Sequence, residues 1–206
     1  MSSFNDCRSV SRARNYAACG ITATKIPHAE PPVRENLHAL QIVLSIKNDR
    51  MKNLSIIEAR SIEDYAAARS LIQQYANWLG VDLEFQGFSK ELASLETMYG
   101  PPLGAILLAC LDGTYVGCVG LRPLERDIAE MKRMFVVPEH HGKGIGRMLL
   151  ESFIAKARAL DYKAIRLDTV PRLDAATAMY RRHGFVDITP YRYNPAPDAI
   201  FLELKL

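Results

Sequence analysis

A cluster of closely spaced glycines is the clearest chemical feature of this sequence. Gly142, Gly144 and Gly146 alternate with Lys143 and Ile145, just before a segment with the apolar spacing of a helix. Glycines leave the backbone open, and the first N–H groups of a helix lack partners within the helix. The helix dipole also places partial positive charge at this end. The turn is therefore suited to binding phosphate groups.

Spacing distinguishes the kinds of phosphate-binding loop. A Walker A loop requires Gly-Lys-Ser/Thr after four intervening residues, but Lys143 lies between glycines and no hydroxyl follows it. A dinucleotide fingerprint requires G-x-G-x-x-G, whereas this chain has G-x-G-x-G. Asp168 nevertheless follows at the distance expected of a ribose-binding acid. The Walker loop is excluded, and a dinucleotide-binding oxidoreductase remains an alternative that requires a second βαβ half.

The elements that must position this turn are predicted from periodicity, beginning at Leu54. Strands alternate with helices, and Asp112-Gly113 between two β-rich segments predicts a hairpin. We expect the α/β class, with a mixed, mostly antiparallel sheet of about six to seven strands and about four helices. Expected strands are 54–58, 105–111, 115–121, 130–137, 164–169, 185–188 and 200–205, and expected helices run from Ser61 to before Gly80, after a cap at Ser89, over 144–160, and from a cap at Asp174 to His183.

Charge is distributed unevenly along the 206 residues. The net charge of +3 falls on residues 1–50, so the remainder is neutral. We expect residues 1–50 to be a disordered or loosely attached extension and residues 51–206 to form the folded domain. A neutral domain without clustered Lys/Arg argues against nucleic acid as a partner. No apolar run approaches the roughly 20 residues that span a bilayer, so no membrane partner is expected.

The four cysteines carry no recognisable metal or redox pattern. They form no C-x-x-C pair and lack the spacing of metal ligands. We therefore expect reduced thiols, no bound metal and a cytoplasmic location. The cysteines are Cys7, Cys19, Cys110 and Cys118.

Two segments together resemble a known family. The string HGKGIG, residues 141–146, is similar to motif A of the GNAT (Gcn5-related) N-acetyltransferase superfamily, Arg/Gln-x-x-Gly-x-Gly/Ala, with His141 in place of the usual Arg or Gln. The segment AATAMYRRHGF resembles the family's A-x-x-x-Y-x-x-x-GF block, with Tyr180 on the matching position. Leu173 occupies the position of an Asn that many members carry. The resemblance covers Leu54 to Leu206 and implies the GNAT fold.

The resemblance also implies acetyl-coenzyme A (acetyl-CoA) as cosubstrate. In the family, the glycine loop holds the pyrophosphate, and the preceding strand diverges from its neighbour so that its backbone pairs with the pantetheine. The residues implied in this binding are Met134, Phe135, Val136, His141, Gly142, Lys143, Gly144, Ile145, Gly146 and Arg147.

Acetyl transfer to an amine requires a base and an acid, and the resemblance suggests one residue for each. Glu130 occupies the position of the general base in histone-type members; the alternative is an ion pair with Lys132 or Arg133. Tyr180 matches the usual acid for the leaving thiolate, because a phenol and an alkyl thiol have comparable pKa values. The alternative for Tyr180 is a helix tyrosine packed on the sheet.

The acceptor side is less well defined. Gln86, Phe88 and Arg122 are candidate acceptor-binding residues on connections beside the predicted sheet, or they merely complete the core and surface. The motif blocks contain no cysteine, which favours direct transfer over an acyl-enzyme. We expect an N-acetyltransferase acting on a primary amine of a small molecule or peptide, as a monomer or homodimer. A non-catalytic acyl-CoA-binding module is the alternative.

Overall fold

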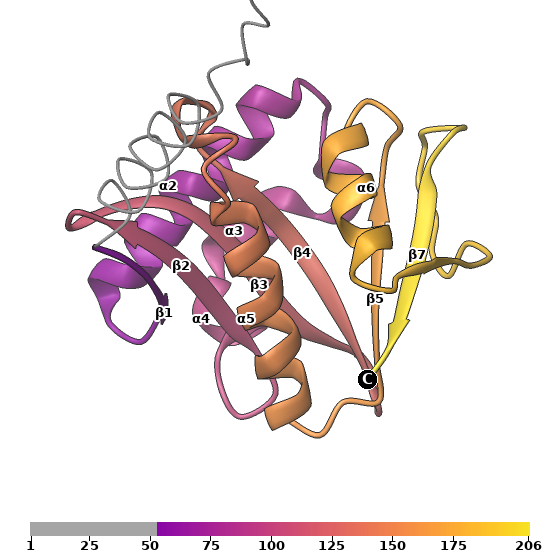
Figure 1. The fold of residues 1–206 in the computed structure, drawn as a ribbon. Coiled ribbons are helices and arrows are strands. Elements are labelled where there is room, and N and C mark those ends of the chain that lie inside the picture. Colours follow the sequence, from indigo (N-terminus) through magenta and orange to yellow (C-terminus); the bar gives the residue numbers. More distant parts are fainter. Residues whose placement is uncertain (1–52) are drawn as a thin grey trace, which may run out of the picture. The chain divides into compact units, whose positions relative to one another are not determined.

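A seven-stranded sheet forms the centre of the computed structural model, which describes residues 53–206 (Figure 1). The predicted extension at residues 1–50 lies outside the described residues. The strands are β1 Leu54–Glu58, β2 Ala105–Leu111, β3 Thr114–Glu125, β4 Ile128–Val136, β5 Ala164–Thr169, β6 Val186–Asp187 and β7 Ile200–Lys205. The helices are α2 Ile62–Leu79, α3 Phe88–Ala93, α4 Leu95–Tyr99, α5 Ile145–Ala159 and α6 Asp174–Arg182, with short 3₁₀ turns η1 Glu84–Gln86 and η2 Pro138–His140.

The sheet is mixed and mostly antiparallel, as predicted. Its strand order is β1-β2-β3-β4-β5-β7-β6, and only β4 and β5 are parallel. These two strands pair only where Ile128–Glu130 faces Ala164–Arg166, and Figure 1 shows them diverging beyond that point. The divergence opens the sheet toward the glycine loop.

The hairpin between β2 and β3 forms at the predicted turn. Asp112 and Gly113 have φ angles of 50° and 79°, which suit the tight turn between twisted strands. Strand β3 continues to Glu125, so the prediction that Arg122 lies on a connection was wrong. Continued pairing with β4 extends the strand, and Pro123 is tolerated because the register shifts beside it.

Helix α2 begins after Ser61, as predicted, and a capping box forms there. The Ser61 hydroxyl accepts from the Asp64 amide at 3.1 Å, and the Asp64 carboxylate accepts from the Arg60 and Ser61 amides at 3.0 Å each. These bonds lower the pKa of Asp64 to about 2. Gly80, in the left-handed conformation, ends the helix.

Two other predicted caps were wrong. Ser89 lies inside α3, whose cap is Gly87, and its amide and hydroxyl both donate to the Glu84 carboxylate. Asp174 is the first residue of α6 rather than its cap. The stretch after α2 also forms two short helices, α3 and α4, in place of one, which raises the described α-helices to five.

The sheet separates two apolar clusters. Helix α5 contacts β2, β3 and β4 on one face, whereas α2 contacts the same three strands on the other, with α4 beside it. Figure 1 shows α5 in front of the sheet and α2 to α4 behind it. Trp78, near the end of α2, is 47% exposed and lies near the rings of Phe135 and His141.

Candidate active site

The glycine loop lies between β4 and α5 and is open toward solvent. Gly142 and Gly144 have φ angles of 73° and 82°, which favour glycine, and a Cβ at either position meets no atom within 4 Å. Gly144 is the N-cap of α5 and provides no side-chain cap. The first amides of α5 therefore have no side-chain cap, which leaves them available to a phosphate group.

A cavity of about 560 Å³, here called the loop cavity, lies against this turn. Its walls come from the loop, the end of β4 and the facing side of α6. His141 is tied to the strand end, because its Nε2 donates to the Val136 carbonyl at 2.7 Å. The predicted residues that line it are Met134, Phe135, Val136, His141, Gly142, Gly144, Ile145, Gly146, Arg147 and Tyr180. Lys143 does not line it; its Nζ lies 3.1 Å from Nδ1 of His140.

A bulge in β4 lies at the edge of the loop cavity. Gly120 faces Lys132 and Cys118 faces Phe135, so one extra residue stands on β4 between these pairs. Arg133 adopts φ 56° there, a conformation that costs a non-glycine residue roughly 1–2 kcal/mol. The bulge and the divergence from β5 leave backbone groups of β4 facing the cavity instead of a neighbouring strand.

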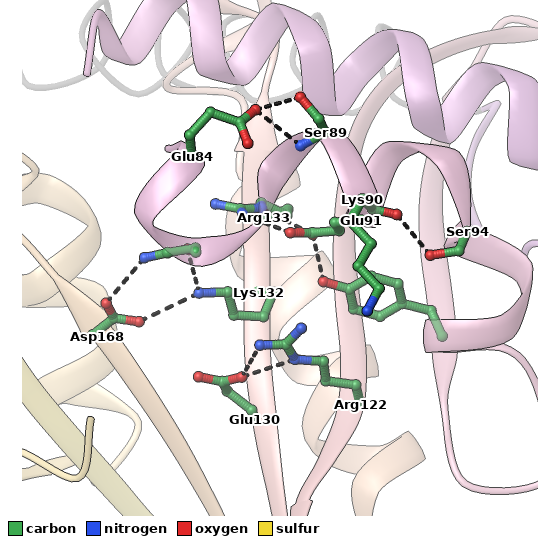
Figure 2. A network of polar contacts seen from close by, with 12 residues as sticks. Glu84, Ser89, Lys90, Glu91, Ser94, Arg122, Glu130, Lys132, Arg133 and Asp168 are labelled. Atoms are coloured by element: carbon green, nitrogen blue, oxygen red, sulfur yellow. Dashed lines mark hydrogen bonds and ion pairs between the residues drawn. The ribbon is translucent and has the colours of Figure 1, made fainter. Parts of the chain in front are cut away.

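A buried ion pair holds the bulged residue in place. Nε and Nη2 of Arg133 donate to Oε1 and Oε2 of Glu91 at 3.0 and 2.6 Å (Figure 2). The Tyr99 hydroxyl donates to Oε1 of Glu91 at 2.6 Å. Burial raises the pKa of Glu91, but the bonds from Arg133 outweigh that effect and lower it. Phe88, a predicted acceptor residue, is buried beneath the Arg133 guanidinium at 5.3 Å and lines neither cavity.

A second cavity of about 330 Å³, here called the side cavity, adjoins the loop cavity. Gln86, Lys132, Asp168 and Asn194 provide its polar side, and an apolar wall comes mainly from the end of α2 and the segment after it. Gln86 therefore lines a cavity, and its acceptor role stays a prediction. Both cavities are lined by Tyr75, Met131, Arg133, Asp168, Thr169 and Leu173.

Glu130 is fully buried among cations. Its Oε2 accepts from Nε and Nη2 of Arg122 at 2.9 and 2.7 Å, and its Oε1 accepts from Nη1 of Arg192 at 2.7 Å. The alternative of a pair with Lys132 or Arg133 was wrong, because the cross-strand neighbour of Glu130 is Arg122. Neither Glu130 nor Arg122 lines either cavity.

Two titratable groups beside the cavities have shifted pKa values that bear on the chemistry. Burial lowers the pKa of Lys132 to about 8, although Asp168 and Glu130 oppose the shift. Burial raises the pKa of Tyr180 above its ordinary value, so the phenol stays protonated and is a weaker acid than expected from sequence.

Sequence reasoning did not assign an acceptor role to Lys132, Asp168, Asn194 or Arg192. Asp168 lies near the C-terminal end of β5, beside the point where β4 and β5 diverge. Its position near a strand end is the sequence signal that could have identified it. Asn194 and Arg192 lie in the aperiodic turn segment before β7, which carries no pattern to identify them. Within residues 53–206, Cys110 and Cys118 are free cysteines, and burial raises the pKa of Cys118 to about 12.

No cluster of three or more His, Cys, Asp or Glu suited to a metal ion occurs between residues 53 and 206. None of the helices in this part of the chain is long and apolar enough to cross a membrane.

Comparisons with known proteins agree with this geometry. The model of the acetyltransferase (GNAT) family matches residues 67–185. An uncharacterised N-acetyltransferase of Schizosaccharomyces pombe is 35% identical over 75% of this chain and 96% of its own. An IAA acetyltransferase of Azospirillum brasilense is 36% identical over 76% of this chain and all of its own. A Salmonella typhimurium acetyltransferase solved with its cofactor acetyl-CoA has a TM-score of 0.56 at 20% identity, over 75% of this chain and 94% of that one.

Proposed function

This chain belongs to the GNAT acetyltransferase family, and we propose that it transfers the acetyl group of acetyl-CoA directly to a primary amine held in the side cavity. The observation that supports the proposal is the junction of the two cavities. The loop cavity adjoins a phosphate-binding turn, and it shares six lining residues with a smaller cavity that has polar and apolar sides. A cosubstrate and an acceptor bound in these cavities meet beside Tyr75, Met131 and Arg133.

The fit to acetyl-CoA rests on the loop and the bulged strand. Gly142 and Gly144 have no Cβ atoms, so a pyrophosphate can approach their backbone amides closely. The backbone of Met134, Phe135 and Val136 is suited to pairing with the pantetheine amides, because β5 diverges from β4 there. Acetyl-CoA supplies the thioester carbonyl that the amine attacks. During transfer the N–C bond forms, the C–S bond breaks, the amine loses a proton and the sulfur gains one.

Tyr180 is the proposed proton donor to the sulfur. It lies on α6, lines the loop cavity and is only 5% exposed. Its raised pKa keeps the hydroxyl protonated, so it donates a hydrogen bond to the developing thiolate before any proton moves.

The base is less directly supported. Glu130 remains the predicted base, but both of its oxygens are bound by guanidinium groups and it lines neither cavity. A proton from the amine therefore reaches Glu130 only through intervening groups. The ion-pair role of Glu130 has the stronger geometric support.

The test is a screen of candidate acceptors with the purified full-length chain and acetyl-CoA, reading free thiol. The panel holds monoamines, amino acids, short peptides and, because the Azospirillum relative is named for it, IAA. We expect thiol release that depends on an amine acceptor. Acetyl-CoA binding without thiol release from any acceptor supports the non-catalytic module instead. Family membership already favours the acetyltransferase over the dinucleotide-binding alternative.

A further inference from the structure

Five charged side chains form a continuous chain that ends at the side cavity. In order they are Arg122, Glu130, Arg192, Asp168 and Lys132, so their charges alternate and begin and end with a cation. The side chains of Glu130, Asp168 and Lys132 are 0%, 5% and 4% exposed. Figure 2 shows Lys132 facing Asp168, with Glu130 and Arg122 nearby.

Together these five side chains carry one more positive charge than negative charge. Three cations face two anions, and the neighbouring pair of Arg133 and Glu91 is balanced by itself. A buried charge without a counter-charge is unfavourable. An anionic group bound in the side cavity restores the balance, whereas a simple ammonium ion increases the imbalance.

Of the three cations, Lys132 is the one placed to meet such an anion. Its Nζ donates to Oε1 of Gln86 at 2.8 Å and lies 3.5 Å from Oδ1 of Asp168. An ammonium group has three donors, so one remains for a ligand. Lys132 lines the side cavity, whereas Arg122 does not. Asp168 lines both cavities, so its carboxylate can accept a hydrogen bond from the neutral amino group that attacks at the junction, and an amino acid in this form carries the one negative charge that restores the balance.

The apolar wall of the side cavity defines the rest of the ligand. Leu79, Val81, Leu83 and Phe85 line it on the side of α2 and η1. The volume of about 330 Å³ is at the small end of ligand pockets, which suits a single amino acid rather than a folded protein surface.

We propose that the acceptor is a free amino acid with an apolar side chain, whose carboxylate binds Lys132 while its α-amino group faces the acetyl group at the junction of the cavities. This inference rests on the proposed function and names its substrate class. The bonds made and broken are those of the proposed acetyl transfer, and the acceptor's carboxylate is not altered.

The first test compares matched acceptors in the thiol-release assay: leucine, leucinamide and 3-methylbutylamine, which is leucine without its carboxylate. We expect kcat/KM for leucine to exceed that of both analogues by about 100-fold, the scale of one buried charge-assisted contact. Equal or better use of the analogues overturns the acceptor class and leaves the proposed function intact. No thiol release from any amine overturns both.

The second test changes the lysine. Lys132→Met keeps most of the aliphatic stem and removes the charge, and Lys163→Met, at the exposed residue just before β5, is the matched control. We expect Lys132→Met to raise the KM for leucine at least tenfold and to abolish the preference over 3-methylbutylamine, with acetyl-CoA affinity retained. An unchanged preference in a variant that still binds acetyl-CoA overturns the assignment.

The third test needs no variant and no turnover. The probe is 4-methylpentanoate, which has the carboxylate and side chain of leucine but no amine, and 4-methylpentanamide is its control. Asp168, Glu130, Arg133 and Arg192 surround Lys132, and its pKa is about 8. We expect calorimetry to show affinity for the carboxylate falling about tenfold between pH 7 and pH 9, as Lys132 loses its proton. A pH-independent affinity, or equal binding of the amide, contradicts the proposal.

Discussion

Tyr180 is the proposed acid, and a single substitution tests this role. Its ring contacts Phe185 with centroids 5.8 Å apart, so removing the hydroxyl leaves the packing in place. We expect Tyr180→Phe to lower kcat about 100-fold, the lower range for a positioned acid, while the Kd of acetyl-CoA stays unchanged. Steady-state thiol release measures it. Tyr193→Phe, at a side chain that is 76% exposed, is the control, and a normal kcat in Tyr180→Phe excludes the phenol as the acid.

Glu130 has two possible roles that give different results on substitution. Because Arg122 and Arg192 bind both oxygens, we expect Glu130→Gln to lower the free energy of unfolding by about 3–5 kcal/mol. Urea denaturation measures this, and Glu125→Gln, which affects only the more exposed pair with Arg166, serves as control. Unchanged stability together with a 10²- to 10⁴-fold loss of kcat identifies Glu130 as the base instead.

At the scale of single residues, sequence reasoning located residues whose place is fixed by a motif. It missed side-chain contacts whose partners come from distant segments. The glycines of the loop were singled out by their spacing and by the resemblance to motif A, and they line the loop cavity. Arg192 is 62 residues from Glu130, and nothing in the intervening sequence reveals the contact. The partners of a buried charge depend on tertiary contacts that no local pattern encodes.

Among the elements, the turn from the glycine loop into α5 gives the sharpest test. Gly144→Asp puts a carboxylate beside the expected pyrophosphate, so we expect acetyl-CoA affinity to fall at least about 100-fold. Gly113→Asp is a matched control, because Gly113 also has a positive φ (79°) and open space around its missing Cβ. Both changes strain the backbone, but only the first adds charge at the site. Calorimetry with acetyl-CoA distinguishes them, and equal losses refute the loop assignment.

The regular elements were predictable from sequence because their signals are local. The capping box at Ser61 and the Asp112-Gly113 turn depend on residues only a few positions apart. The bulge at Arg133 was not predicted, since its left-handed conformation depends on Glu91, which is 42 residues away. The shape of the site therefore came from the structure, whereas most of its framework could be read from the chain.

At the scale of the described chain, the ion pair of Arg133 and Glu91 joins helix α3 to strand β4. Glu91→Gln leaves a buried guanidinium without its counter-charge, so we expect a loss of about 3–5 kcal/mol in the free energy of unfolding at pH 7. Glu96→Gln, in an exposed pair with Arg69, is expected to cost no more than about 1 kcal/mol.

The pH dependence of that loss provides a second check. The pKa of Glu91 in the folded chain is lowered, so the unfolded chain binds the proton more tightly. The stabilisation is present above the unfolded pKa of about 4.5 and is lost as pH falls through the folded value. The difference between wild type and Glu91→Gln should shrink in acid, and a constant difference from pH 7 to pH 3 argues against the ion pair.

Because β4 diverges from β5, we expect the pantetheine of acetyl-CoA to pair with β4 in place of a neighbouring strand. In the free enzyme, β4 amides that face β5 beyond Glu130 lack a ladder partner from that strand, so they should exchange with solvent deuterium readily. Bound cosubstrate supplies acceptors at the same edge and should slow that exchange. If acetyl-CoA protects the loop at Gly142–Gly146 but leaves exchange at Met131–Val136 unchanged, the cosubstrate contacts the protein through its phosphates and does not pair with β4.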